Sequence, residues 1–134
     1  KRLFLVFSIL LANLAAFAID DNCSTIYDSI IAGDISKAED AASKIYAQKS
    51  ACSATNLADL AIIYHQLVDK SSDAVTRYDY VLKTIDCYNS AVGKDSNAAH
   101  ARFTEKKVNM DAVVKNYNAN LSKFQQAVSD SMNF

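Results

Sequence analysis

The chain has 134 residues, of which two are glycine and none is proline, and 51% are hydrophobic. Average usage would give about nine glycines and seven prolines, so the composition argues against a turn-rich β-sandwich or barrel, and the apolar content argues against a disordered chain. The 14 basic and 15 acidic residues leave a formal net charge of −1 at pH 7. Because the basic residues are scattered singly, no nucleic-acid partner is expected. These numbers predict one all-α domain.

Residues 1–18 have the pattern of a secretory signal peptide. Lys1 and Arg2 precede an apolar run that ends in Ala16-Phe17-Ala18, the small-x-small pattern that signal peptidases cut. The acidic and polar residues that follow favour a cleaved signal over a membrane anchor. We expect cleavage after Ala18, a secreted, periplasmic or other extracytoplasmic location, and no integral membrane segment in the rest. Residues 19–134 would then form a single helical domain with a net charge of −3, since 12 basic and 15 acidic residues remain.

A first α-hairpin is expected over about residues 24–50. Its first helix ends at Gly33, because glycine is the residue most often found just after a helix. The second helix begins at Asp34 or Ile35 and continues toward Lys49 with apolar residues on one face. We therefore expect two short antiparallel helices joined at the glycine.

A second α-hairpin is expected over about residues 55–91. Its first helix carries an apolar stripe with the i, i+3, i+4, i+7 spacing of one helix face, formed by Leu57, Leu60, Ala61, Tyr64, Leu67 and Val68. Ser71-Ser72-Asp73 supplies helix-capping residues, and a second apolar face follows at Ala74, Tyr78, Val81, Leu82 and Ile85. Because the connection is only a few residues long, the two helices must pack antiparallel.

The last third of the chain is expected to form one long helix over about residues 96–132, capped by Asp95 or Ser96. Two apolar lanes repeat there every seven residues, one of Phe103, Met110, Tyr117 and Phe124 and the other of Val114, Leu121 and Val128, and together they form a seam for helix packing. We expect this helix to be continuous and to cap the two hairpins. A homodimer formed through its seam is a further possibility. The alternative is that Asn116, Asn118 and Asn120 break it, since asparagine favours turns.

Residues 24–88 also carry an internal repeat. A shift of about 37 residues places Tyr27 on Tyr64, and a period of this length is typical of helical repeats. The segment resembles tetratricopeptide repeats. The matching residues are Leu60, Ala61 and Tyr64 in the first helix of the second hairpin, Ala74, Tyr78, Val81 and Leu82 in its second helix, and Gly33, Asp34 and Ala38 in the first hairpin. The family's opening Trp and closing Pro are absent. The resemblance implies stacked α-hairpins that bind a peptide or partner protein, whereas generic helix packing in a bundle is the alternative.

The three cysteines, Cys23, Cys52 and Cys87, all lie in the expected exported part, where an oxidising compartment lets disulfides persist. Antiparallel helices bring the two ends of the first hairpin together, so a Cys23–Cys52 disulfide is expected, and its loop of about 30 residues would stabilise the fold by roughly 3–4 kcal/mol. A Cys52–Cys87 disulfide is the alternative, and no bridge at all is the third outcome. In either bridged case one cysteine remains.

No motif in the sequence points to catalysis. His65 and His100 lie on different expected helices with no Cys, Asp or Glu at metal-ligand spacing, so we expect neither a metal site nor a cofactor. Two isolated glycines leave no phosphate-binding loop, and no serine has a nucleophile-elbow context. His65 is expected to be a half-buried packing residue. A histidine within hydrogen-bond reach of a carboxylate in a cleft would be the observation that favours an enzyme.

Aromatic residues and methionine are enriched at protein interfaces, and the candidates for partner contact are Tyr80, Tyr88, Phe103, Met110, Tyr117 and Phe124. The leading hypothesis is an exported, non-catalytic binding or scaffold protein that holds a peptide or partner protein between its hairpins and the last helix. One alternative is a small secreted, disulfide-stapled helical bundle that inhibits an enzyme or acts as an effector. Another is a carrier of a hydrophobic ligand, which needs a closed apolar cavity.

Overall fold

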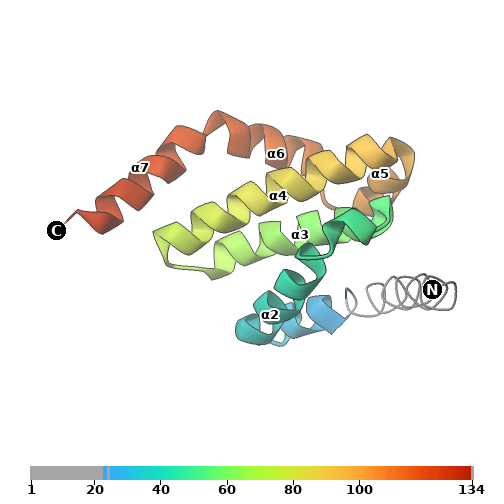
Figure 1. Ribbon diagram of the computed structural model, residues 1–134, viewed down its shortest axis with the longest axis horizontal. Coiled ribbons are helices and arrows are strands. Elements are labelled where there is room, and N and C mark those ends of the chain that lie inside the picture. The colour runs from blue at the N-terminus through green and yellow to red at the C-terminus, as the bar shows by residue number, and fades with distance from the viewer. Residues whose placement is uncertain (1–22, 24, 134) are drawn as a thin grey trace, which may run out of the picture.

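The computed structural model describes residues 23 and 25–133, and every regular element among them is a helix (Figure 1). Residues 25–31 are helical. The elements that follow are α2 Ile35–Tyr46, the 3₁₀ turn η1 Lys49–Ala51, α3 Ala54–Lys70, α4 Ala74–Lys94, α5 Ser96–Glu105, α6 Met110–Ala119 and α7 Leu121–Met132. The all-helical class expected from the scarcity of glycine and proline is confirmed. The expected signal peptide, residues 1–18, lies outside the described residues.

The first hairpin is built on the turn at Gly33, as expected. Gly33 has a φ of +83°, a left-handed conformation that glycine adopts without steric cost. Asp34 then caps α2, because its side chain accepts a hydrogen bond from the backbone N–H of Lys37 at 3.2 Å. Helix α2 ends at Tyr46, earlier than the expected Lys49, and η1 leads into α3.

The second hairpin, α3 and α4, forms the centre of the molecule. Ser53 and Asp73 cap the two helices with side-chain oxygens that accept hydrogen bonds from the backbone N–H groups of Asn56 and Thr76. Helix α3 buries side chains on almost every face along its first three turns, as a central helix must. Helix α4 continues through Gly93, so this glycine lies inside the helix instead of marking its end.

The expectation of one continuous helix over residues 96–132 is wrong, because the chain turns twice there. After α5 it turns at Lys107, whose φ is 58°, and Asn109 caps α6 with its side chain. The second turn is at Asn120, whose side-chain amide donates to the backbone carbonyl of Asn116 at 2.8 Å. The asparagine break that the sequence offered as the alternative is therefore present, and a second break precedes it.

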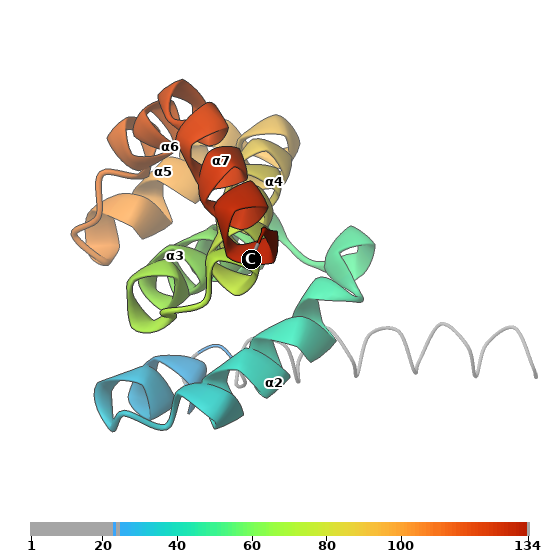
Figure 2. The ribbon, with the colours of Figure 1, turned by 90° about the vertical axis from the view of Figure 1, so that its left-hand side faces the viewer.

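The helices form three layers (Figure 2). Residues 25–31 and α2 pack on one side of α3, whereas α5, α6 and α7 cover the α3–α4 pair from the other side. The apolar core between the layers includes the fully buried side chains of Leu60, Ile62, Tyr64, Leu67 and Val81. The turns in the last third send α6 and α7 back along α4. The junction of α6 and α7 thereby comes to lie next to the start of α4.

Candidate functional site

A groove of about 370 Å³ lies between the start of α4 and the junction of α6 and α7; we call it the α4–α7 groove. Helix α4 contributes Ala74 and Arg77 to its lining, α6 contributes Asn116, and α7 contributes Lys123, Phe124 and Ala127, while Ser72 and Asn120 also line it. Its volume is near the lower end of the range of roughly 300–1,000 Å³ for ligand sites. The groove therefore has room for a short segment of a larger partner.

Two positive charges line this groove. Arg77 is half-buried and Lys123 is exposed, and within the described residues neither forms an ion pair with a carboxylate. No aspartate or glutamate is among the described residues that line the groove. Charges of one sign in a recess with partly apolar walls reinforce each other's potential. The described lining of the α4–α7 groove therefore carries two positive charges and no negative one.

Asp73 lies four residues before Arg77, but its carboxylate is engaged at the start of α4. It accepts hydrogen bonds from the hydroxyl of Thr76 and from the backbone N–H of Thr76 at 2.9 Å. These two bonds, the hydroxyl first, hold the pKa of Asp73 below its ordinary value. The carboxylate thus stays ionised at a helix N-terminus, where the helix dipole favours negative charge.

The apolar floor of the groove is held by a chain of ring contacts that leads into the core. Phe124 packs edge-on against Tyr117 with ring centroids 5.9 Å apart, and Tyr117 packs against His65 of α3 with centroids 5.7 Å apart. The Tyr117 hydroxyl lies 2.6 Å from Nδ1 of His65. Burial lowers the pKa of His65 and so favours the neutral ring. In the tautomer with its proton on Nε2, Nδ1 accepts this hydrogen bond from the Tyr117 hydroxyl. Three helices thus fix the position of Phe124.

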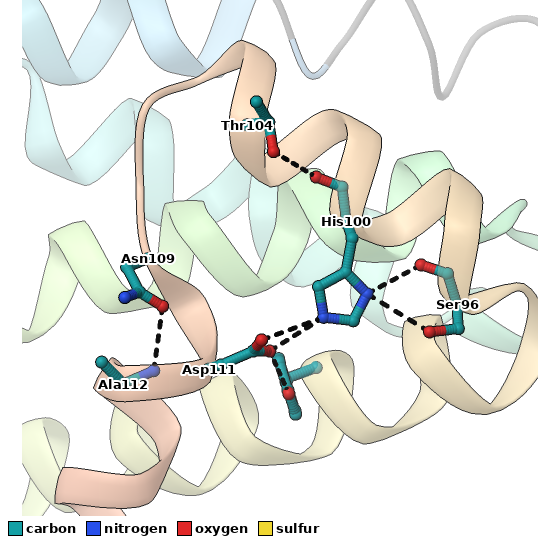
Figure 3. Close-up of polar contacts among 7 residues, drawn as sticks. Ser96, His100, Thr104, Asn109, Asp111 and Ala112 are labelled. Atoms are coloured by element: carbon teal, nitrogen blue, oxygen red, sulfur yellow. Dashed lines mark hydrogen bonds and ion pairs between the residues drawn. The ribbon is translucent and has the colours of Figure 1, made fainter.

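A second polar cluster joins α5 to α6 (Figure 3). Nε2 of His100 lies 3.0 Å from Oδ1 and 3.1 Å from Oδ2 of Asp111, and Nδ1 of His100 lies 2.8 Å from the backbone carbonyl oxygen of Ser96. The hydroxyl of Tyr88 on α4 also donates to Asp111. A cavity of about 420 Å³ lies beside this cluster, with His100 and Asp111 in its lining.

A histidine beside a carboxylate at a cavity is the arrangement that would favour an enzyme, and the Ser96 hydroxyl lies 3.3 Å from Nδ1 of His100. The hydrogen bonds give the ring another role. Carbonyl and carboxylate oxygens only accept, so both nitrogens of His100 donate and the ring is an imidazolium. The Ser96 carbonyl first, and then Asp111, raise the pKa of His100. With no lone pair to take a proton from Ser96, His100 serves as an ionic link between α5 and α6.

A third cavity, of about 440 Å³, lies where the first helix meets the start of α3 and the end of α5. The buried carboxylate of Asp59 there accepts a hydrogen bond from the Tyr27 hydroxyl at 2.9 Å and pairs with Nη1 of Arg102 at 3.4 Å. The ammonium of Lys106 lies over the Tyr27 ring, 4.4 Å from its centroid. Burial, the largest cause, and then Asp59 raise the pKa of Tyr27, so its hydroxyl keeps the proton it donates. This network ties three segments of the fold together.

Four of the six expected partner-contact residues lie in the core: Tyr80, Phe103, Met110 and Tyr117 are between 1% and 7% exposed. The expectation of partner contact is corrected for these four, because their side chains pack within the chain. For Phe103, Met110 and Tyr117 the physical reason is the pair of turns at Lys107 and Asn120, which folds the apolar seam back onto α3 and α4. Tyr80 lies on α4, and its ring packs against Tyr64 of α3 with centroids 5.8 Å apart.

The other two residues differ in position. Tyr88 is half-buried and stacks on the Phe103 ring at 5.8 Å, whereas Phe124 is half-buried and lines the α4–α7 groove. The sequence did not single out Arg77 or Lys123. Each is an isolated basic residue in the sequence, and only the return of α7 along α4 places both in one recess.

The three cysteines are all buried, and no disulfide joins them in this structure. Sγ of Cys52 lies 3.6 Å from the backbone carbonyl oxygen of Gln48. Burial, with a smaller contribution from Asp86, raises the pKa of Cys87 to about 12. The Cys23–Cys52 and Cys52–Cys87 pairings stay predictions.

Within residues 23 and 25–133, no group of three His, Cys, Asp or Glu side chains is placed to hold a metal ion. In the same part of the chain, no helix combines the length and the hydropathy needed to cross a membrane. Comparisons with protein-family models, with curated proteins and with solved structures find no match to this chain. Function is therefore inferred from the geometry of the described residues.

Proposed function

We propose that this chain is a non-catalytic binding protein that holds a peptide segment of a partner protein in the α4–α7 groove. The observation that carries the proposal is the composition of the groove, in which the apolar floor of Phe124 and Ala127 lies beside hydrogen-bonding side chains such as Asn116. Recesses of mainly apolar surface with a few polar groups are typical binding sites. The groove also lies between the second hairpin and the last helices, where the sequence leads us to expect a binding surface.

The packing of α7 supports the same function. None of its side chains is fully buried; Leu121, Phe124 and Val128 are half-buried, and Met132 is 72% exposed. An amphipathic helix whose apolar face is only partly covered can complete its packing against a partner. Recognition of a peptide in a groove beside such a helix needs no catalytic group.

The alternative functions have less support. A carrier of a hydrophobic ligand needs a closed apolar cavity, whereas the α4–α7 groove is open, with Ser72 and Lys123 exposed in its lining. An inhibitory bundle needs a last helix docked along its whole length, whereas α7 ends in the exposed Met132. The His100–Asp111 pair gives an enzyme no general base at this position, because His100 donates through both of its nitrogens.

We further propose that residues 24–88 are tetratricopeptide-like hairpins and that the protein works outside the cytoplasm. Two consecutive hairpins, with turns at Gly33 and at residues 71–73, support the first part. The basic and apolar pattern of residues 1–18 supports the second part. Stacked hairpins of this kind supply extended surfaces for binding.

The test is a selection from a random peptide library displayed on phage, with the full chain immobilised. The matched variants are Ala127→Tyr, which fills the groove from an exposed position, and Ala101→Tyr, which adds the same side chain at an exposed position of α5 outside the groove. Peptides selected on the unchanged chain should bind Ala101→Tyr equally well. They should lose at least about tenfold in affinity for Ala127→Tyr, which is about 1.4 kcal/mol.

Both tyrosine variants are first checked by far-UV circular dichroism and thermal unfolding, so that a loss of binding is not a loss of fold. Equal binding of the selected peptides to Ala127→Tyr would remove the groove as the site. If no peptide is enriched above the bare support, the proposed function itself fails.

A further inference from the structure

We infer that the peptide segment held in the α4–α7 groove is acidic, with a carboxylate of an Asp or Glu side chain between Arg77 and Lys123 and a neighbouring apolar side chain on Phe124. The inference rests on the proposed function and adds the chemical class of the partner segment. It follows from the charges, the geometry and the size of the groove.

Neither of the two cations in the groove, Arg77 and Lys123, is paired with a carboxylate of the described chain. The recess they line holds no described carboxylate. Among the described residues, Lys49, Lys83 and Arg102 pair with carboxylates of the chain. Several other lysines, such as Lys37 and Lys44 on α2, are exposed and form no ion pair within the described part of the chain. What sets Arg77 and Lys123 apart from the other unpaired cations is that they line the same recess, and charge complementarity there favours an anion on the bound segment.

The two cations come from different helices that border the groove, since Arg77 belongs to α4 and Lys123 to α7. A guanidinium matches a carboxylate with two parallel hydrogen bonds, and the half-burial of Arg77 strengthens such a pair relative to one in open solvent. A carboxylate, the anion that Asp and Glu side chains supply in a peptide, therefore fits between these two helices.

An apolar surface, the ring of Phe124, lies in the same recess as the two charges. Phe124 follows Lys123 directly in the sequence and lines the same recess. A carboxylate bound at Lys123 therefore places the next residues of a peptide against the aromatic ring. We expect the bound segment to carry a large apolar residue within one or two positions of its acidic residue.

Asn116 adds a hydrogen-bonding side chain to the groove. Oδ1 of Asn116 accepts a bond from Nδ2 of Asn120 at 2.9 Å, which leaves the side-chain amide N–H groups of Asn116 to donate to a peptide carbonyl. A groove of about 370 Å³ accommodates only a few side chains. An extended segment of a few residues fits this size, whereas a folded domain does not.

The experiment uses three random peptide libraries with the same apolar positions and one variable class of polar position: Asp and Glu, Asn and Gln, or Lys and Arg. Each library is passed over the immobilised full chain at low salt, and the retained peptides are counted by sequencing. The acidic library should be retained about tenfold more than the basic one. Raising the salt concentration should shrink this ratio, because exposed charges are screened.

The variants for this experiment are the double substitution Arg77→Gln with Lys123→Gln and its matched control, Lys37→Gln with Lys44→Gln. The control removes two charges from exposed positions of α2, outside the groove. The preference for acidic peptides should fall toward onefold in the groove variant and stay unchanged in the control. Both variants are checked for wild-type thermal unfolding.

The outcomes separate the two proposals. If all three libraries are retained alike, and all are lost on Ala127→Tyr, the acidic segment is wrong and the proposed function stands. If the acidic preference is the same in the groove variant and in the α2 control, the assignment to Arg77 and Lys123 is wrong. If no library is retained more on the unchanged chain than on Ala127→Tyr, the proposed function and the inference both fail.

Discussion

The hydroxyl of Tyr117 on α6 and Nδ1 of His65 on α3 share a hydrogen bond, with 2.6 Å between the two atoms. The Tyr117 side chain is 7% exposed, and its ring also meets Phe124 of α7. This bond therefore connects the central hairpin to the helix that forms one wall of the α4–α7 groove. The stability of the fold and the shape of the groove depend on the same contact.

Replacing Tyr117 by Phe should lower the free energy of unfolding by about 1 kcal/mol. The ring contacts stay, but Nδ1 of His65 loses its hydrogen-bond partner in a partly buried place. Urea unfolding followed by circular dichroism measures the change. The matched control is Tyr78→Phe, because the Tyr78 hydroxyl accepts only an exposed bond from Gln125, and its loss should stay within about 0.5 kcal/mol. Equal losses in the two variants would contradict this account.

The protonation of His65 should make the fold less stable in acid. Burial lowers the pKa of His65, against a smaller opposing effect of Asp69. Below about pH 6.5 the unfolded chain takes up a proton that the folded ring excludes, so the free energy of unfolding falls as the pH falls. His65→Gln keeps an acceptor for Tyr117 without titrating. Its stability relative to the unchanged chain should rise on going from about pH 7.5 to about pH 5; a constant difference would disprove the effect.

His100 should have the opposite pH dependence. The Ser96 carbonyl and Asp111 raise its pKa, and Tyr88 first, then His100, lower the pKa of Asp111. The contribution of His100 is therefore fully present below about pH 6.5 and is lost as the pH rises through the raised folded-state pKa. The side chains of His100 and Asp111 are 41% and 54% exposed, so the effect is small and screened by salt.

The measurement for His100 compares the unchanged chain with His100→Gln and with Asp111→Asn in thermal unfolding. Both variants should be less stable than the unchanged chain near pH 5, and the His100→Gln deficit should vanish in mildly alkaline buffer. A high concentration of sodium chloride should reduce the deficit at acidic pH. A deficit of His100→Gln that grows with pH would refute the assigned imidazolium.

Asp59 should be one of the most sensitive polar positions of the fold. It is 3% exposed, and Asp59→Ala leaves the Tyr27 hydroxyl and the Arg102 guanidinium without the carboxylate they share. The expected loss is on the order of 2–3 kcal/mol, because these hydrogen bonds involve a charged group. Asp79→Ala is the control, since it breaks a partly exposed i, i+4 pair with Lys83 and should cost at most about 0.5 kcal/mol. Urea midpoints that rank the two variants the other way would disprove the role of the buried network.

The cysteine pairing can be decided by alkylation in denaturant without a reducing agent, followed by mass spectrometry. The Cys23–Cys52 disulfide predicts one labelled residue, Cys87, and the Cys52–Cys87 disulfide predicts Cys23. Labelling of all three would reject both pairings. In the folded protein, Cys87 should resist alkylation at neutral pH, because it is buried and its pKa is raised to about 12, and the thiolate is the reactive form.

The sequence was sufficient to predict the helical class and much of the first two hairpins. The turn at Gly33 and the caps at Asp34, Asp73 and Asp95 depend on contacts within three or four residues along the chain, so neighbouring residues determine them. The half-buried position of His65 followed equally from the apolar stripe on its own helix.

The course of the last third required the tertiary structure. Phe103, Met110, Tyr117 and Phe124 have the spacing of a seam on one straight helix, yet they lie on three helices. A seven-residue repeat predicts that these side chains are buried, but it does not predict which surface buries them. Packing against α3 and α4 decides that, and the turns at Lys107 and Asn120 allow it.

The α4–α7 groove also required the tertiary structure. Arg77 and Lys123 are isolated basic residues in the sequence, and no periodicity relates them. They line one recess because the chain changes direction at Lys107 and again at Asn120, so that α7 runs back along α4. Local propensity and apolar spacing determined that this chain is helical and which faces are buried, because both act between near neighbours. Only the packing of distant helices decided where a recess forms and which charges line it, because a recess is made by segments that the sequence keeps far apart.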